Sequence, residues 1–305
     1  MKIRILGTTV LVCSFLGLAS GQQPNGINPA AGIDRAPDGI NAARGGIVYH
    51  GGQILGTNAS NPVHMYLIFY GNWAGLDPGG PGIMTDFINN LGGSGWWNIL
   101  TSYVTAGGVS IKNGVVLDGT VNDNYSQGKN LTDASLQLVV QKWISNGTFT
   151  AKTNAIYHVL SSSDVNETSG FCSSYCGFHN HMTFNGVDIK YSFIGNPVHC
   201  VAQGGVADCQ GEASNITASP NNDPGVDAMI SVLAHESAEA TSDPDLNAWY
   251  FPNGQENADK CAYTYGTVFS EANGSKANVT MGNRDYLIQQ NWIASGSQRC
   301  ALTYP

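Results

Sequence analysis

The side chains most able to do chemistry lie in one acidic stretch around residue 240. His235 and Glu239 are four residues apart with Glu236 between them, so a helix would place His235 and Glu239 on one face. This His-Glu-x-x-Glu pattern differs by one residue from the His-Glu-x-x-His of zinc peptidases, in which two side chains one turn apart hold the metal and the intervening Glu moves protons. Glu256 and Asp259 follow soon enough to fold back onto the helix. We therefore predict a metal site formed by His235 and Glu239 with Glu256 or Asp259, and Glu236 as its general base.

A single helix must position the first three of these residues, and the sequence indicates its bounds. Asp223 is a good N-cap, Pro224 suits the first turn, and Pro244 disfavours helix beyond about residue 243. One face, opposite His235, is apolar, and the residues around His235 and Glu239 are small; these are Val226, Met229, Ile230 and Leu233, and Ala228, Ser231, Ala238 and Ser242. We predict that the apolar face packs into a core and that the other face leaves room for a ligand.

The identity of the ion is open at this point. Glu239 replaces the second His of zinc peptidases, and a carboxylate is a harder ligand than an imidazole. Calcium, magnesium and manganese fit such ligands as readily as zinc, and we expect a divalent ion, Zn²⁺ or Ca²⁺, as the cofactor. The alternative is a surface His–Glu pair without function, which adds only about 0.3 kcal/mol to a helix. The spacing alone does not decide between the two.

Other polar and aromatic residues offer weaker candidates. His179 and His181 are two apart in a predicted strand and so share a face, but ordinary hydrogen bonds are favoured over metal ligation. Asp245 lies ten residues after His235, where some zinc peptidases place a third ligand after a glycine turn; that turn is missing here, so Glu256 or Asp259 is preferred. A core role is favoured over a sugar-binding surface for Trp73, Trp96, Trp97 and Trp249.

The N-terminus has the pattern of a secretory signal. In Met1–Gly21, Lys2 and Arg4 precede a mostly apolar run, and small residues follow it. Residues 22–45 are rich in Pro, Gly, Asn and Ala and are expected to form a flexible leader. The remaining chain, 46–305, is expected to form one domain. No later stretch approaches the ~18 uninterrupted apolar residues of a membrane span, so we expect no membrane anchor.

Charge and glycosylation motifs support the same extracellular interpretation. The formal net charge of −9 becomes −11 when Lys2 and Arg4 leave with the signal, which argues against nucleic acid and anionic membranes as partners. Eight Asn-x-Ser/Thr motifs predict exposed, glycosylated segments. Their asparagines are Asn58, Asn124, Asn130, Asn146, Asn166, Asn215, Asn273 and Asn278.

The cysteine count also fits secretion. Once Cys13 leaves with the signal, six cysteines remain, and three disulfides are the natural expectation in an oxidising compartment. Many pairings are possible. Proximity in the sequence favours Cys172–Cys176, Cys200–Cys209 and Cys261–Cys300.

The remaining patterns place the motifs on a mixed set of elements. Strands are predicted at 63–70 and 155–160, within 171–196 and at 285–289, with a hairpin of 108–112 against 115–118. Helices are predicted at 83–91 and 133–145. The expected fold class is α+β, a single disulfide-bonded domain in which a mixed sheet packs on the long helix carrying the His-Glu-x-x-Glu motif. A zincin-like arrangement is one interpretation of this order.

Several of these segments resemble a known family. They are IVYHGGQIL (47–55), MYLIFYGNW (65–73), YSQGKNLT (125–132), FCSSYCGFH (171–179), GVDAMISVLAHESAEATSDPDLNAWY (225–250) and ENADKC (256–261). Together they are similar to the EXORDIUM / phosphate-induced protein 1 family over residues 46–304, except that 197–223 is a longer polar loop. The resemblance implies a secreted protein associated with the cell wall or apoplast and with growth and cell expansion. It places the family's own His-Glu-x-x-Glu at His235, Glu236 and Glu239, and its later acidic residues at Glu256 and Asp259.

Two functions from different classes follow. The first is a secreted glycoprotein of the extracellular matrix or cell wall that acts by binding wall or matrix components and holds a structural metal. The second is a metal-dependent hydrolase, most plausibly a peptidase acting on a peptide substrate. In it, Glu236 takes a proton from a metal-bound water.

Overall fold

The computed structural model describes residues 46–202, 209 and 218–305. The predicted signal (1–21), the leader (22–45) and most of the polar loop before the long helix lie outside the described residues. Within them the chain is a mixed α/β protein with three disulfides.

The centre of the fold is a five-stranded sheet of order β3-β2-β5-β8-β7. Its strands are β2 (Val63–Tyr70), β3 (Val115–Asp123), β5 (Ala155–Ser161), β7 (Gly177–Phe184) and β8 (Val187–Ile194). The first four strands of that order run parallel, and only the edge strand β7 is antiparallel to its neighbour. The sheet is therefore mixed, as expected, but parallel strands dominate it.

The sequences of the central strands explain their position. Every residue of β5 is buried, as are all but one of β2, which is the continuous apolar pattern of strands covered on both faces. In contrast, β3 alternates between partly buried and exposed residues along most of its length, as an edge strand with one wet face does.

One predicted pairing is wrong. The Asn113-Gly114 turn predicted a hairpin of 108–112 against 115–118, but Val115 instead pairs in parallel with Val63. The backbone N–H of Lys112 donates to Gly56 O over 2.8 Å. A long-range partner with a deeply buried face outweighs the local turn preference, because an isolated two-stranded hairpin is only marginally stable.

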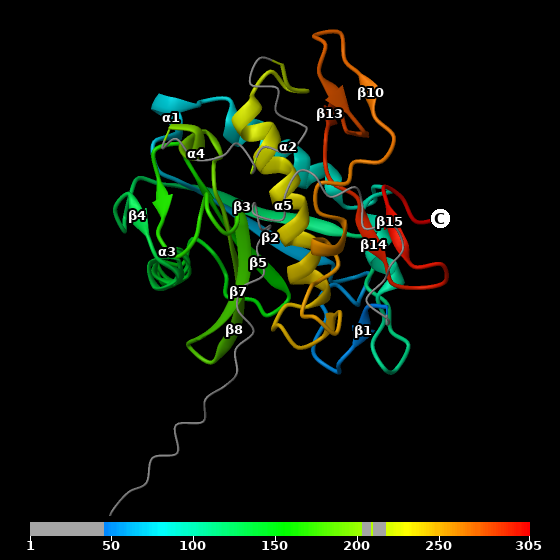
Figure 1. Cartoon of the computed structure of the whole chain (residues 1–305). Helices are drawn as coiled ribbons and strands as arrows, with labels where there is room; N and C mark the ends of the chain where they lie inside the picture. The colour runs from blue at the N-terminus through cyan, green and yellow to red at the C-terminus, as the bar shows by residue number, and fades with distance from the viewer. Residues whose placement is uncertain (1–45, 203–208, 210–217) are drawn as a thin grey trace, which may run out of the picture.

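Helices cover both faces of the sheet (Figure 1). On one side, α3 (Asp133–Ser145) reaches β8 through Asp133, whose Oδ1 accepts from Tyr191 Oη over 2.5 Å. On the other side, α5 (Pro224–Ser242) lies against β7 and β8, and its Ser237 Oγ is 3.4 Å from His158 Nε2 of β5. The further helices are α1 (Trp73–Leu76), α2 (Gly80–Leu91), α4 (Val198–Ala202) and the 3₁₀ turns η1 (Trp97–Ser102) and η3 (Asp259–Cys261).

Short antiparallel pairs surround this core. They are β1 (Val48–Tyr49) with β9 (Trp249–Tyr250), β10 (Phe269–Ser270) with β11 (Lys276–Ala277), β12 (Val279–Met281) with β13 (Arg284–Tyr286), and β14 (Asn291–Ile293) with β15 (Arg299–Ala301). A parallel pair joins β4 (Asn130–Leu131) to β6 (Asn166–Glu167). The core role predicted for tryptophans is confirmed: at most 8% of the surface of Trp73, Trp96, Trp97 and Trp249 is exposed.

All six cysteines among the described residues form disulfides, but two of the proximity-based pairings are wrong. The bonds are Cys172–Cys200, Cys176–Cys209 and Cys261–Cys300; only the last matches the prediction. Cys172 lies in a turn with a left-handed φ of 71°, whereas Cys176 directly precedes β7. The turn directs the two side chains to different neighbours, so closeness in sequence does not make them partners.

Candidate metal centre

Helix α5 positions three of the predicted site residues. It begins at its N-cap Asp223, whose side chain accepts from Val226 N, and it ends at Ser242 before Pro244. His235 and Glu239 lie one turn apart, with His235 Nε2 3.2 Å from Glu239 Oε1. His235, Glu236 and Glu239 are completely buried.

The prediction that one face of this helix is open to a ligand is wrong. Residues 225–242 are all buried, because β7, β8, α2 and η1 pack around α5. The edge strand comes especially close at Gly177: a Cβ there would lie 2.6 Å from Val232 Cγ1 and 3.4 Å from Glu236 Oε1. The small side chains of the helix thus allow neighbouring segments to pack closely against it, and no open groove remains.

The segment after the helix returns to it, so that both later acidic residues lie beside the first three. Asp259 N donates to Glu239 Oε1 over 3.0 Å, and Asp259 Oδ1 is 3.6 Å from His235 Nε2. Glu256 N donates to Asp259 Oδ2 over 3.1 Å. The Cys261–Cys300 disulfide ties this returning turn, η3, to β15.

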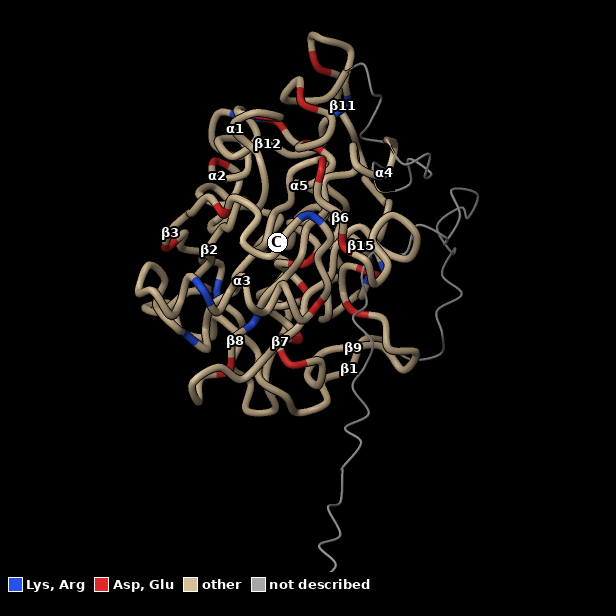
Figure 2. Tube along the Cα trace, turned by 90° about the vertical axis from the view of Figure 1, so that its left-hand side faces the viewer, with Lys and Arg blue, Asp and Glu red and all other residues tan. Residues whose placement is uncertain are grey.

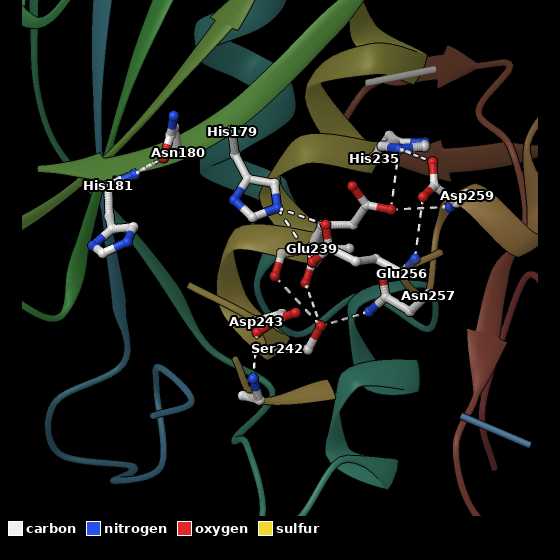
Figure 3. A network of polar contacts seen from close by, with 12 residues as sticks. His179, Asn180, His181, His235, Glu239, Ser242, Asp243, Glu256, Asn257 and Asp259 are labelled. Atoms are coloured by element: carbon white, nitrogen blue, oxygen red, sulfur yellow. Dashed lines mark hydrogen bonds and ion pairs between the residues drawn. The ribbon is translucent and has the colours of Figure 1, made fainter. Parts of the chain in front are cut away.

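His179, for which the sequence favoured ordinary hydrogen bonds over metal ligation, lies beside these acidic residues. His179 on β7 is 1% exposed, and its Nε2 lies 3.1 Å from Glu256 Oε2. Figure 3 shows its ring directed at Glu256 and Glu239, with His235 and Asp259 on the far side of Glu239. The alternation of the strand indicated that His179 and His181 share a face, but only the packing of β7 against α5 shows which element that face meets. We call His179, His235, Glu236, Glu239, Glu256 and Asp259 the buried cluster.

Burial dominates the electrostatics of the acidic groups. It raises the pKa of Glu236, Glu256 and Asp259 well above the ordinary values, because a carboxylate loses hydration in the interior, and neighbouring carboxylates add to the effect. Without a positive partner, such groups resist ionisation. A bound cation would reverse this preference by stabilising the charged forms.

The pKa values of the two imidazoles, His179 and His235, shift in opposite directions. Burial lowers the pKa of His179 to about 4. Burial also disfavours the charged form of His235, but the negative charge and hydrogen bond of Glu239 outweigh it and raise the pKa of His235 to about 10. In the ion-free protein, His235 is therefore a cation that pairs with carboxylates. A metal ion bound at the ring nitrogen would replace the proton that gives the imidazole this charge.

Several ligand-type atoms of the cluster have no hydrogen-bond partner. They include both oxygens of Glu236, Oε2 of Glu239 and Nδ1 of His179 and of His235. Asp123 shows what a satisfied buried carboxylate looks like in this chain: it accepts from Lys142 Nζ, Trp143 Nε1 and both N and Oγ of Ser126. The difference is expected where a cation, rather than protein donors, completes the carboxylates.

In a second group of potential metal ligands, the carboxylates already pair with a lysine side chain. His181, Asp188 and Asp245 lie close together, but Lys190 Nζ is 2.7 Å from Asp188 and 3.2 Å from Asp245. Asp245, the alternative third ligand, therefore pairs with a lysine instead of with the cluster. His158 is a core residue, with Nδ1 2.7 Å from the side-chain oxygen of Ser192.

Access from solvent to the cluster is narrow. Asp259 has the most exposed side chain of the six, at 11%. Two surface hollows, around His64 and Lys152 and around Arg299 and Tyr304, contain none of the six. The arrangement can enclose an ion, and a substrate would have to enter beside Asp259.

Comparison with known proteins places this centre in a family. The sequence profile of the phosphate-induced protein 1 conserved region matches residues 47–300. The chain belongs to the phosphate-induced protein 1 family. The matched range contains all six cluster residues and all six disulfide-bonded cysteines.

Three relatives of this chain are plant proteins. Protein EXORDIUM-like 3 of Arabidopsis thaliana is 32% identical over 80% of this chain and 79% of its own length. Protein EXORDIUM-like 5 of the same plant is 30% identical over 80% of this chain and 74% of its own length. Protein PHOSPHATE-INDUCED 1 of Nicotiana tabacum is 29% identical over 66% of each chain. These similarities confirm the resemblance inferred from the motifs.

Proposed function

We propose that this protein is a secreted glycoprotein of the extracellular matrix or cell wall, of EXORDIUM type, whose buried cluster holds a divalent cation. The observation that carries the proposal is the set of buried carboxylate and imidazole atoms without hydrogen-bond partners in a cluster closed to solvent. An enclosed cation suits a structural role, in which it fastens β7, α5 and the returning turn to one another. Two imidazoles among the ligands favour Zn²⁺ over Ca²⁺.

Other features support an extracellular binding role. Three disulfides are typical of proteins that fold in an oxidising compartment. Among the described residues, no helix is long and apolar enough to cross a membrane. Acidic residues outnumber basic ones, 22 to 13, and occur throughout the described chain (Figure 2), so matrix or wall components are the expected partners rather than nucleic acid.

The sugar prediction can be sharpened by geometry. Asn146 is exposed at the end of α3, whereas Asn278 is partly buried and its Nδ2 donates to Tyr265 O and Ile288 O. An N-linked sugar replaces a hydrogen of Nδ2 and would break one of these bonds. We expect mass spectrometry of tryptic peptides from a eukaryotic host to find a sugar at Asn146 and none at Asn278. A fully modified Asn278 would contradict this geometry. Asn215 lies outside the described residues.

A metal-dependent hydrolase of the peptidase class is the second candidate function. The observation that favours it is the carboxylate of Glu236, which follows His235 directly and has no hydrogen-bond partner, as a general base for a metal-bound water requires. The closed cluster counts against it, because a catalytic ion keeps a position open to substrate.

Metal content and cleavage together test the two functions. We expect the purified secreted protein to contain a divalent ion, and His235→Ala to contain at most about half as much of it. Peptide libraries should remain uncut by the wild type and by Glu236→Gln. Cleavage by the wild type that disappears in Glu236→Gln, with the ion retained, would establish the hydrolase instead. Wild-type protein that binds no ion would overturn the proposed site.

A further inference from the structure

The buried cluster contains two sets of ligands, not one. His179, Glu236 and Glu239 form the first set, and His235, Glu239 and Asp259 form the second. Within each set, one ligand atom from each residue lies within 4.8 Å of the other two, a spacing from which small movements would bring three ligands onto one ion. Glu239 is the member that both sets share.

The two oxygens of Glu239 differ in a way that suits a shared ligand. Its Oε1 faces the second set, 3.2 Å from His235 Nε2 and 3.0 Å from the Asp259 N–H that donates to it. Its Oε2 is buried and has no hydrogen-bond partner. A bridging carboxylate uses one oxygen for each of two ions, and Figure 3 shows Glu239 between the two imidazoles.

The charge of the cluster also fits two ions. Glu236, Glu239, Glu256 and Asp259 are four carboxylates in an almost entirely buried volume. One divalent cation would neutralise half of their full charge, whereas two would neutralise all of it. Buried charge without compensation is costly, so the second ion relieves an imbalance that the first would leave.

The two remaining residues extend the first set. Glu256 approaches His179 closely, with 3.1 Å between Glu256 Oε2 and His179 Nε2, and the first set is therefore built from β7, α5 and the returning turn. The Glu236 carboxylate has no protein donor that would keep it from ligation. Each set thus offers one imidazole and at least two carboxylates.

We infer that the cluster binds two divalent transition-metal ions bridged by Glu239, one held by His235 and Asp259 and the other by His179 and Glu236 with Glu256 beside them. This inference rests on the proposed function, which requires only one ion. One imidazole and several carboxylates per ion suit Zn²⁺ and Mn²⁺, and carboxylate-bridged pairs of ions lie about 3.5–4 Å apart. Glu236 is then a metal ligand and not a free general base.

The stoichiometry of metal binding tests the second ion separately from the first. The full secreted protein is stripped of metal, loaded with Zn²⁺ and analysed by isothermal titration calorimetry and by elemental analysis after desalting. We expect two ions per chain in the wild type, one in His179→Ala and none in Glu239→Ala. One ion in the wild type would overturn the second site and leave the proposed function in place, and no ion would overturn both.

A matched control and a spectroscopic measurement protect the test against misfolded variants. His181→Ala changes the other histidine of the same strand, whose ring lies near Asp188 and Asp245, and it should still bind two ions. In wild-type protein loaded with Mn²⁺, the electron paramagnetic resonance spectrum should show the exchange coupling of two bridged ions. Two bound ions with uncoupled spectra would overturn the bridge by Glu239.

Discussion

Removal of bound metal is expected to lower the melting temperature of this protein by about 10 °C. An ion present at a thousand times its dissociation constant adds about 4 kcal/mol to the folded state, and about 2–4 °C accompanies each kcal/mol in a domain of this size. The effect is large because the ion joins β7, α5 and the returning turn through His179, His235 and Asp259. Differential scanning calorimetry before and after chelation, followed by re-addition of Zn²⁺, measures it.

The ion-free protein should also respond to pH in a recognisable way. Burial raises the folded-state pKa of Glu236 and Glu256, so their contribution to stability is present below the unfolded value of about 4.3 and is lost as pH rises. Burial opposes the charge of His235, but Glu239 raises its pKa to about 10. Its contribution is complete below about pH 6.5 and is lost toward pH 10.

Between pH 7 and 9, the contribution of His235 is lost as pH rises. The lowered pKa values of His179 and His158, about 4 and 3, act only below about pH 6.5, where their contribution is lost as pH falls. The melting temperature of the chelated protein should therefore fall from pH 7 to pH 9, and that of the metal-loaded protein should fall less. Identical pH profiles with and without metal would show that the ion does not bind at these groups.

The second large effect is expected from the Cys261–Cys300 disulfide. Replacing both cysteines by Ala opens a loop with a sequence separation of 39 residues, which in the chain-entropy account costs about 4 kcal/mol. A fall of about 8–15 °C in melting temperature follows. Because Asp259 begins the turn that ends at Cys261, the affinity for Zn²⁺ should also fall at least about tenfold, as it does when the support of a metal ligand is removed.

The Cys172–Cys200 disulfide provides the matched control. It closes a loop of similar length, with a sequence separation of 28, and neither cysteine lies on an element that carries a cluster residue. Its double Ala variant should lose a similar amount of stability, about 3.6 kcal/mol, while its affinity for Zn²⁺ stays within about twofold of the wild type. Equal loss of affinity in both variants would mean that general destabilisation, rather than the position of Asp259, controls metal binding.

Local patterns were sufficient where an element is determined by its own residues. The N-cap Asp223 and Pro244 set the bounds of α5, Thr132 caps α3, and the apolar run at 63–70 forms β2. The prediction of a hairpin around Asn113 was wrong because its second strand, from Val115 on, pairs with the buried strand β2 instead. The predicted pairing of Cys172 with Cys176 was wrong for a related reason: a turn directs the Cys172 side chain toward Cys200 on α4.

The sequence by itself identified five of the six residues of the buried cluster: His235, Glu236 and Glu239 follow from helical spacing, and Glu256 and Asp259 follow from their closeness to the helix end. Only the tertiary structure decided that β7 presses against α5 and brings His179 to Glu256, and that the helix is enclosed on every side. The physical reason is that spacing along one element fixes the face on which a side chain lies. Which other element covers that face depends on burial of apolar surface across the whole chain.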